Sequence, residues 1–436
     1  MIGVFGHVGN RNLGDEAIIH VVIENIKHRY PAGEIRGFTL KPQDTAERHN
    51  ISAFPIRRLD EVESSNTTDT LDPVVSQTDG AQSGPFAMLK TTLKKFPLLF
   101  SFLKSVQTLI LTLLSALKEP RFLFQCYRNL KGVDLLIIAG SSQLIDYVAG
   151  GPWGHPYTVF KWVMLAKVRK SKVAFMSCGM GPVETMLGRF FIRSSLSIAD
   201  YRSFRDKVSF DCAEQIGVTA PCSIFPDLVY GLRVEESGSG GETSNTRPIV
   251  GINPVPFSDS KAWVGSGADA YAVYIGLLAD FTTWLVRRGY NVTLFPTQLN
   301  LDPPVIKDIV GILKKADTLD LERNIIDTPV NNFDELMSSM SKTDMIIATR
   351  YHGVVFSHLL NKPVIGIAYA SKTADLMRMI GQSDFTVDIL NMNLQILQER
   401  FIELESRRSA IQEEAPLRIS AYRQALENQY DQVLGL

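Results

Sequence analysis

Short apolar runs of strand length alternate with apolar residues at helical spacing along most of this chain. Residues 345–348 form one such run, which is typical of a strand that is buried on both faces of a parallel sheet. Residues 353–360 continue with apolar positions at helical spacing. Between them stand Arg350, Tyr351 and His352. The pattern predicts a buried strand, a tight turn and a helix.

The same alternation occurs before and after a polar, glycine-rich segment at 235–247, which we predict to be a linker. Further strands are predicted at 2–5, 34–40, 133–139, 172–177, 249–253, 291–295 and 363–368, and helices at 17–30, 207–216, 271–288, 304–315, 332–341 and 400–432, the last with a break near Pro416. Strands alternating with helices indicate parallel sheets. We therefore predict an α/β protein with two Rossmann-like, doubly wound domains, 1–234 and 248–395, facing a central cleft, and a C-terminal helical segment at 396–436.

One segment of the first domain departs from this alternation. Residues 64–85 are polar and favour a loop, whereas residues 96–117 carry apolar residues at helical spacing with serines, threonines and a lysine on another face. Three lysines precede this amphipathic helix, at positions 90, 94 and 95. Two interpretations stay open: a helix in the core or a homo-oligomer interface, and a helix on an anionic membrane surface. Its scattered polar residues argue against a transmembrane span.

The composition of the chain argues against several classes of function. The chain has 436 residues and a net charge of -1, so it lacks the basic field expected of a nucleic-acid-binding protein. Its four cysteines contain no C-x-x-C pair, which suggests neither a zinc site nor a disulfide framework. A reducing, cytoplasmic setting fits, and the N-terminus reads as a core strand rather than a signal peptide.

Two predicted turns contain residues that could bind a ligand or transfer a proton. A turn that opens a helix favours bound anions, and there Arg350 supplies a fork of donors, His352 a proton-transfer group and Gly353 room for close approach. The alternative is a solvated surface turn. The glycine-rich turn after the first strand ends in Asp15 and Glu16, which either cap a helix or act in a site.

The order of the motifs points to a family. The chain contains G-x-x-G-N-x-N-x-G-D-E-A-I, then G-S-S-Q-L-I-D, C-G-M-G-P-V, F-R-D-K-V-S and P-D-L, and later F-P-T-Q and T-R-Y-H-G. In this order they resemble the polysaccharide pyruvyl transferase family from about residue 2 to residue 370. The resemblance implies a glycosyltransferase-B-like fold, phosphoenolpyruvate as donor substrate, and transfer of the pyruvyl group to a sugar as a ketal.

The resemblance also assigns roles to residues. Arg350 and His352, with the backbone at Tyr351 and the adjacent Gly353, would hold the phosphate and carboxylate of the donor. Arg205, in the motif F-R-D-K-V-S, would reach the same anion from the other domain. His352 is the first candidate for proton transfer. The carboxylates of Asp15, Glu16 and Asp146 are candidates to bind or deprotonate the acceptor.

Two departures from the family pattern stand out. The loop usually written with paired glycines reads Gly140-Ser141-Ser142, and residues 64–117 look inserted, which suggests a private acceptor or attachment to the inner face of a membrane. The expected partners are phosphoenolpyruvate and a sugar or lipid-linked oligosaccharide of a cell-surface polysaccharide, with no cofactor or metal. Alternatives are a glycosyltransferase that uses a nucleotide sugar, and a non-catalytic scaffold that docks through residues 96–117.

Overall fold

The computed structural model describes residues 1–6, 9, 11–58, 118–147, 150–234, 247–257, 267–315, 323–326 and 329–436. These residues belong to two compact units, Met1–Ile56 with Val133–Leu436, and Arg57–Gly132. The second unit includes a helix over residues 118–129.

Three predicted segments fall largely or wholly outside the described residues. They are the polar loop at 64–85, the amphipathic helix at 96–117 and all but the last residue of the linker at 235–247. Their predictions stay predictions.

The first half of the chain forms a seven-stranded parallel sheet in the order β3-β2-β1-β4-β5-β6-β7. Its strands are β1 (Ile2–Phe5), β2 (Ile35–Thr39), β3 (Ser52–Pro55), β4 (Leu135–Ala139), β5 (Lys172–Cys178), β6 (Tyr201–Phe204) and β7 (Ser223–Ile224). The register pairs Val4 of β1 with Gly37 of β2 on one side and with Ile137 of β4 on the other.

The second half forms a six-stranded parallel sheet in the order β10-β9-β8-β11-β12-β13. Its strands are β8 (Ile249–Asn253), β9 (Asn291–Leu294), β10 (Ile325–Ile326), β11 (Met345–Ala348), β12 (Val364–Ala368) and β13 (Thr386–Asp388). The predicted α/β class with two doubly wound sheets is confirmed.

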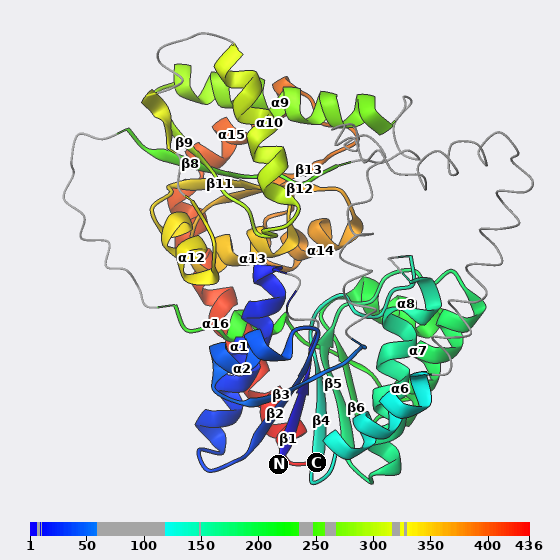
Figure 1. The fold of residues 1–436 in the computed structure, drawn as a ribbon. Helices are drawn as coiled ribbons and strands as arrows, with labels where there is room; N and C mark the ends of the chain where they lie inside the picture. The colour runs from blue at the N-terminus through cyan, green and yellow to red at the C-terminus, as the bar shows by residue number, and fades with distance from the viewer. Residues whose placement is uncertain are drawn as a thin grey trace, which may run out of the picture. The chain divides into compact units, whose positions relative to one another are not determined.

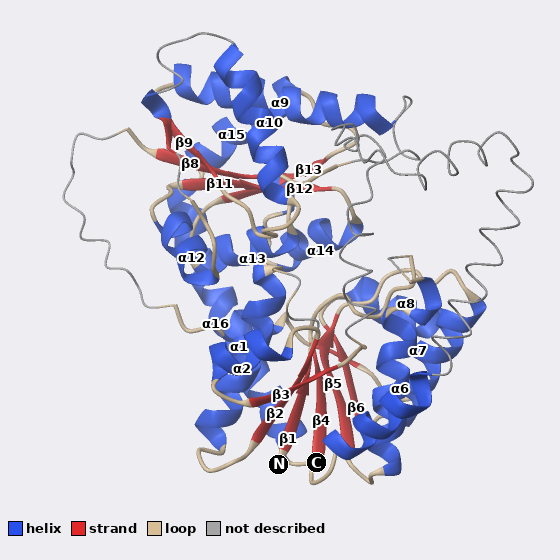
Figure 2. Cartoon of the chain, viewed as in Figure 1, coloured by secondary structure: helices blue, strands red, loops and turns tan. Residues whose placement is uncertain are grey.

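Helices cover both faces of each sheet (Figures 1 and 2). In the first half they are α1 (Leu13–Arg29), α2 (Pro42–His49), α6 (His155–Val168), α7 (Met186–Ile198) and α8 (Lys207–Gln215), with short 3-10 turns η1 (Gly151–Trp153) and η2 (Leu228–Gly231). In the second half they are α9 (Gly267–Arg287), α10 (Asp302–Lys315), α12 (Phe333–Ser341), α13 (Tyr351–Leu359), α14 (Ser371–Met379), α15 (Leu394–Ser406) and α16 (Arg408–Leu434), with η3 (Ser383–Phe385).

The central strands explain why these sheets form. All five residues of β4 and all four of β11 are buried, because helices lie against both faces of a parallel sheet. In each sheet the strand order reverses beside the first strand, at β1/β4 and at β8/β11. Loops at the carboxyl ends of strands next to such a switch point form the usual ligand crevice of doubly wound sheets.

The C-terminal helical segment differs from its prediction. The helix breaks between Ser406 and Arg408, and α16 continues through Pro416. A proline leaves the carbonyl four residues earlier without its helical donor. Here that carbonyl belongs to Gln412, and it accepts a hydrogen bond of 2.9 Å from the Asn361 side chain. The external donor explains why the predicted break near Pro416 is wrong.

Candidate active site

A cavity of about 270 Å³ lies where loops of the two sheets meet. Its lining comes from both halves of the chain: Asn12, Asp15, Ser141, Ser142, Gln143, Ile145, His155, Arg205, Thr297, Gln298, Arg350, Tyr351, His352, Tyr369 and Lys372. The loops after β1, β4, β6, β11 and β12 contribute most of these side chains, so the cavity lies at the switch points of both sheets.

The predicted turn after β11 supplies the anion-binding geometry. Arg350 is the N-cap of α13, and its side chain does not cap the helix. The first N–H groups of an α-helix have no helical acceptor and lie at the positive end of the helix dipole, so they favour a bound anion. A side chain at Gly353 would not fit, since its Cβ would lie 2.4 Å from Asn253 Oδ1.

Arg350 is held in place by one buried acid. Its Nε and one terminal nitrogen donate to Asp302 Oδ1 over 3.1 and 2.5 Å. The other oxygen of Asp302 accepts from the backbone N–H groups of Thr297 and Gln298. These bonds fix the guanidinium at the edge of the cavity, where its remaining N–H groups can bind a ligand.

Arg205 enters from the first sheet, at the end of β6. Its terminal nitrogens donate to Asp227 over 3.2 Å and to Ser142 Oγ over 2.7 Å. Its guanidinium lies 4.2 Å from the centroid of the Tyr351 ring, a cation–π contact between the two halves of the chain. Within the described residues, its buried Nε has no hydrogen-bond partner. Gly179 leaves room for it, because a Cβ there would lie 2.8 Å from the guanidinium.

His352 is buried beside Arg205. Its Nε2 lies 3.9 Å from Asp227 Oδ2 and makes no hydrogen bond to any described residue. Its ring packs against the start of α1, so closely that a Cβ at Gly14 would lie 2.0 Å from Nδ1. Burial lowers the pKa of His352 to about 4, with Asp227 opposing and Arg205 adding to the shift. The ring is therefore neutral at pH 7.

Asp15 faces the same cavity from the first turn of α1. The helix begins at Leu13, four residues before the predicted start, because the Asn12 side chain caps it by accepting from Gly14 N. Burial raises the pKa of Asp15 to about 6, although a hydrogen bond with Ser141 and the nearby charge of Arg205 lower it. A carboxyl group with this pKa can exchange a proton near neutral pH.

Lys372 adds a third cation, at the start of α14. Its Nζ lies 5.5 Å from the centroid of the Tyr369 ring. Burial raises the pKa of the Tyr369 phenol, but Lys372 and Arg350 lower it more, so the net shift is downward. The arrangement brings three cationic side chains to a small cavity, where Asp227 and Asp302 hold two of them in place and the N–H groups that remain can bind an anionic ligand.

A family model described as polysaccharide pyruvyl transferase matches residues 12–371. This range includes every residue that lines the cavity except Lys372, which follows one residue after its end. The chain belongs to the polysaccharide pyruvyl transferase family. No curated protein matches its sequence.

Solved structures similar to this pyruvyl transferase family member show the fold alone. A putative UDP-N-acetylglucosamine 2-epimerase from Listeria monocytogenes is 11% identical with a TM-score of 0.55, over 99% of this chain and 97% of that one. The UDP-GlcNAc 2-epimerase from Neisseria meningitidis is 13% identical with a TM-score of 0.53, over 100% and 99%. A glycosyltransferase from Rickettsia africae is 10% identical with a TM-score of 0.52, over 99% and 98%. Together they confirm the predicted glycosyltransferase-B-like fold.

Of the predicted site residues of this family member, Arg205, Arg350, Tyr351, His352 and Asp15 line one cavity. Gly353 is not among the residues that line it; its missing side chain leaves room for Asn253, whose Oδ1 would lie 2.4 Å from a Cβ.

Two other predicted acids have partners elsewhere. Glu16 pairs with Arg48 at 2.8 Å and lines a different cavity. Asp146 accepts from the backbone N–H groups of Glu184 and Thr185 and from the Thr185 hydroxyl, so it orders the start of α7.

Sequence reasoning missed several residues of the site. The sequence patterns do not identify Asp227, Asp302 or Lys372, although Asp227 belongs to the motif P-D-L. The serines that replace the family's paired glycines also act here: Ser141 bonds Asp15 and Ser142 bonds Arg205. The positions of Ser141, Ser142 and Lys372 in the sequence could have identified them as site residues, because the serines follow β4 and the lysine follows β12.

Among the described residues, no group of three or more His, Cys, Asp or Glu side chains is placed to hold a metal ion. No helix in the described part of the chain combines the length and apolar character needed to cross a bilayer.

Proposed function

We propose that this protein transfers the pyruvyl group of phosphoenolpyruvate to sugar hydroxyls of a cell-surface polysaccharide or its precursor and closes a ketal. The observation that carries the proposal is the convergence of Arg205, Arg350 and Lys372 on one cavity with the N-terminus of α13. Phosphoenolpyruvate bears a phosphate and a carboxylate on a three-carbon frame, so its site needs several cationic and N–H donors close together.

The size of the cavity supports a small donor. At about 270 Å³ it is near the lower end of the usual range for small-molecule pockets. A nucleotide sugar is several times larger than phosphoenolpyruvate, so the cavity fits the pyruvyl donor better. A scaffold has no need for three converging cations, which argues against the non-catalytic alternative.

The proposed chemistry balances without a cofactor. C3 of the enol takes up a proton as the first sugar hydroxyl attacks C2 and loses its proton to a base. The C2–O bond to phosphate then breaks, and a second hydroxyl attacks C2 and gives up its proton. The products are the ketal, whose C3 is now a methyl group, and inorganic phosphate.

We assign the proton transfers to two residues. The pKa of Asp15, about 6, leaves its carboxylate ionised at pH 7.5 as a base for the acceptor hydroxyl. His352 is neutral at pH 7, but a bound trianion would raise its pKa and let Nε2 carry a proton toward C3. Asp227, beside Nε2, would stabilise that imidazolium.

We further propose that the reaction takes place in the cytoplasm. The free thiols of Cys126, Cys178, Cys212 and Cys222 fit a reducing compartment. The acceptor is proposed to be a sugar of a polysaccharide precursor, with attachment at the inner face of the membrane through residues 96–117 as a further proposal.

Isotope labelling of the donor tests the proposed transfer. The protein is incubated in D₂O with phosphoenolpyruvate carrying ¹³C at C3 and with glycan extracted from cells that make it, after mild acid has removed existing ketals. We expect a ¹³C methyl signal on the glycan, one solvent deuterium in that methyl group and an equal amount of phosphate. The variant His352→Gln, incubated with the same glycan fraction, is the control. We expect it to give no methyl signal. Phosphate release with free pyruvate only, or glycan extension that requires a nucleotide sugar, would contradict the proposal.

A further inference from the structure

The loop after β4 departs from the family pattern, because it reads Gly140-Ser141-Ser142 where paired glycines are usual. Its backbone is fixed: Gly140 N donates to Met176 O over 2.9 Å, and Gly179 N donates to Ser141 O over 2.8 Å. Ser141 has a left-handed backbone with φ 57°, which glycine adopts without a steric cost. Backbone geometry therefore favours glycine at position 141 and does not explain the serine.

Both serines line the cavity of about 270 Å³, here called the donor cavity. The Oγ of Ser142 accepts a hydrogen bond of 2.7 Å from a terminal nitrogen of Arg205. A hydroxyl has one O–H donor as well as two lone pairs, and the O–H of Ser142 donates to no described residue. Because a hydroxyl that accepts from a cation becomes a stronger donor, Ser142 offers a bound anion a further hydrogen bond beside Arg205.

Ser141 contacts a different ionisable group of the same cavity. Its side chain hydrogen-bonds the Asp15 carboxylate, which lowers the pKa of Asp15 against the larger effect of burial. Other titratable side chains also lie around Asp15: Arg205, Lys372, Asp227 and His352. The two cations lower its pKa and Asp227 raises it. The hydroxyl of Ser141 thus works in the same direction as the cations without adding charge to the cavity.

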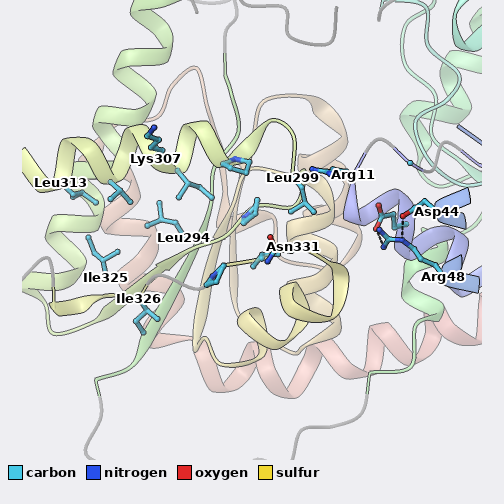
Figure 3. Close-up of a pocket in the computed structure, with 18 of the residues that line it drawn as sticks. Arg11, Asp44, Arg48, Leu294, Leu299, Lys307, Leu313, Ile325, Ile326 and Asn331 are labelled. Carbon is cyan, nitrogen blue, oxygen red and sulfur yellow. Dashed lines mark hydrogen bonds and ion pairs between the residues drawn. The ribbon is translucent and has the colours of Figure 1, made fainter. Parts of the chain in front are cut away.

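Glu16, the next residue of α1, has a different environment. It lines a second cavity, of about 1000 Å³, and pairs there with Arg48 at 2.8 Å. Figure 3 shows Arg48 beside Asp44 at one end of this cavity. Glu16 therefore has a cationic partner of its own, whereas the Asp15 carboxylate has the neutral hydroxyl of Ser141 as a hydrogen-bond donor.

We propose that both serines act in the site: the Ser142 hydroxyl donates a hydrogen bond to the anion that Arg205 binds, and the Ser141 hydroxyl holds Asp15 as a carboxylate. Ser142 is then a binding residue, and Ser141 is a positioning residue that acts through Asp15. That the anion is phosphoenolpyruvate rests on the proposed function, whereas the two hydrogen bonds do not.

Calorimetric titration with phosphoenolpyruvate and with inorganic phosphate tests the role of Ser142. Ser142→Ala removes the hydroxyl, and Ser197→Ala, at an exposed position of α7 outside the cavity lining, is the matched control. We expect Ser142→Ala to weaken binding of each anion by about tenfold, since a hydrogen bond to a charged group is lost, and the control to bind like the wild type. In an Arg205→Lys background the loss should persist, because the bond goes to the anion itself.

The outcomes separate this role from the proposed function. If Ser142→Ala binds phosphoenolpyruvate as tightly as the wild type, the donor site stands and the role of Ser142 is lost. If its effect disappears in the Arg205→Lys background, Ser142 only holds Arg205 and is no binding residue. If the wild type binds phosphate but not phosphoenolpyruvate, and Ser142→Ala weakens that binding, the role of Ser142 stands and the proposed donor fails.

NMR titration of protein labelled with ¹³C at the aspartate carboxyl groups tests the role of Ser141. Ser141→Gly removes the hydroxyl and suits the left-handed backbone, so the variant is expected to fold. We expect the pKa of Asp15, assigned with Asp15→Asn, to rise by about one unit or more, since its carboxylate loses a donor. Lys170→Gly is the matched control, because Lys170 is exposed, lies outside the cavity lining and has a φ of 63°. An unchanged pKa of Asp15 in Ser141→Gly, or an equal rise in the control, would overturn this role.

Discussion

Asp15 illustrates how the cavity sets the chemistry of one residue. The first turn of a helix usually stabilises a carboxylate, yet burial raises the pKa of Asp15 from 3.8 to about 6. A shift of this size corresponds to about 3 kcal/mol of unfavourable free energy when the group is ionised in the folded state. Retaining such a residue is typical of a functional site, where stability is given up for a tuned proton-transfer group.

We therefore predict that Asp15→Asn is more stable than the wild type at neutral pH. The folded pKa lies above the unfolded one, so the folded state holds more protons between pH 4 and pH 6, and the wild type loses stability as pH rises through that window. The stability difference should grow by about 1 kcal/mol from pH 5 to pH 7.5, measured by urea unfolding.

The exposed acid Glu24 on the same helix provides the control for that measurement. Any pH-dependent difference that Glu24→Gln also shows is subtracted as an effect of net charge. A difference for Asp15→Asn that stays constant between the two pH values would contradict a raised pKa.

At the scale of elements, sequence reasoning succeeded where the signal is local. The unit of β11, turn and α13 could be predicted because four consecutive apolar residues, a polar turn and a helical pattern lie within one short stretch. The partners of the turn could not be predicted, since Arg350 meets Asp302 from 48 residues away. Only the packing of the folded chain selects that acid among the many in the sequence.

The prediction at Pro416 failed for a related reason. The local rule that proline interrupts a helix is sound, but it ignores donors from outside the helix. Asn361 supplies one, through its Nδ2 to Gln412 O, and Gln412 Nε2 donates in return to Asn361 O over 3.2 Å. Tertiary contacts of this kind are not visible in a local sequence pattern.

A double-mutant cycle tests this explanation. Asn361→Ala should lower the free energy of unfolding by about 1–2 kcal/mol, because it leaves the Gln412 carbonyl without a donor. In a Pro416→Ala background the new N–H at position 416 can bond that carbonyl, so the same change should cost about 1 kcal/mol less. Asn361 has a φ of 52°, and the strain of alanine there cancels in the cycle. Additive effects in chemical denaturation of the four proteins would refute the explanation.

At the scale of the whole molecule, the donor cavity depends on both halves of the chain. Arg205 comes from the first sheet and stacks on Tyr351 of the second half. The C-terminal helix α16 returns to the first half, where Gln429 donates to the hydroxyl of Ser203 in β6 and Arg423 donates to the backbone of η2. Because the cations are contributed by different halves, ligand binding and the packing of the two sheets should depend on each other.

The most direct test of the central claim is calorimetric titration of phosphoenolpyruvate into the wild type, Arg350→Gln and Lys372→Gln. Glutamine at position 350 can still donate to Asp302, so the fold is expected to survive. Lys342→Gln, an exposed lysine at the end of α12, is the matched control.

We predict that the wild type and the control bind equally well and that each cavity variant loses about tenfold or more in affinity, since a charge-assisted contact is lost. UDP-GlcNAc is the comparison ligand. No binding of phosphoenolpyruvate by the wild type, or equal binding by all four proteins, would contradict the account.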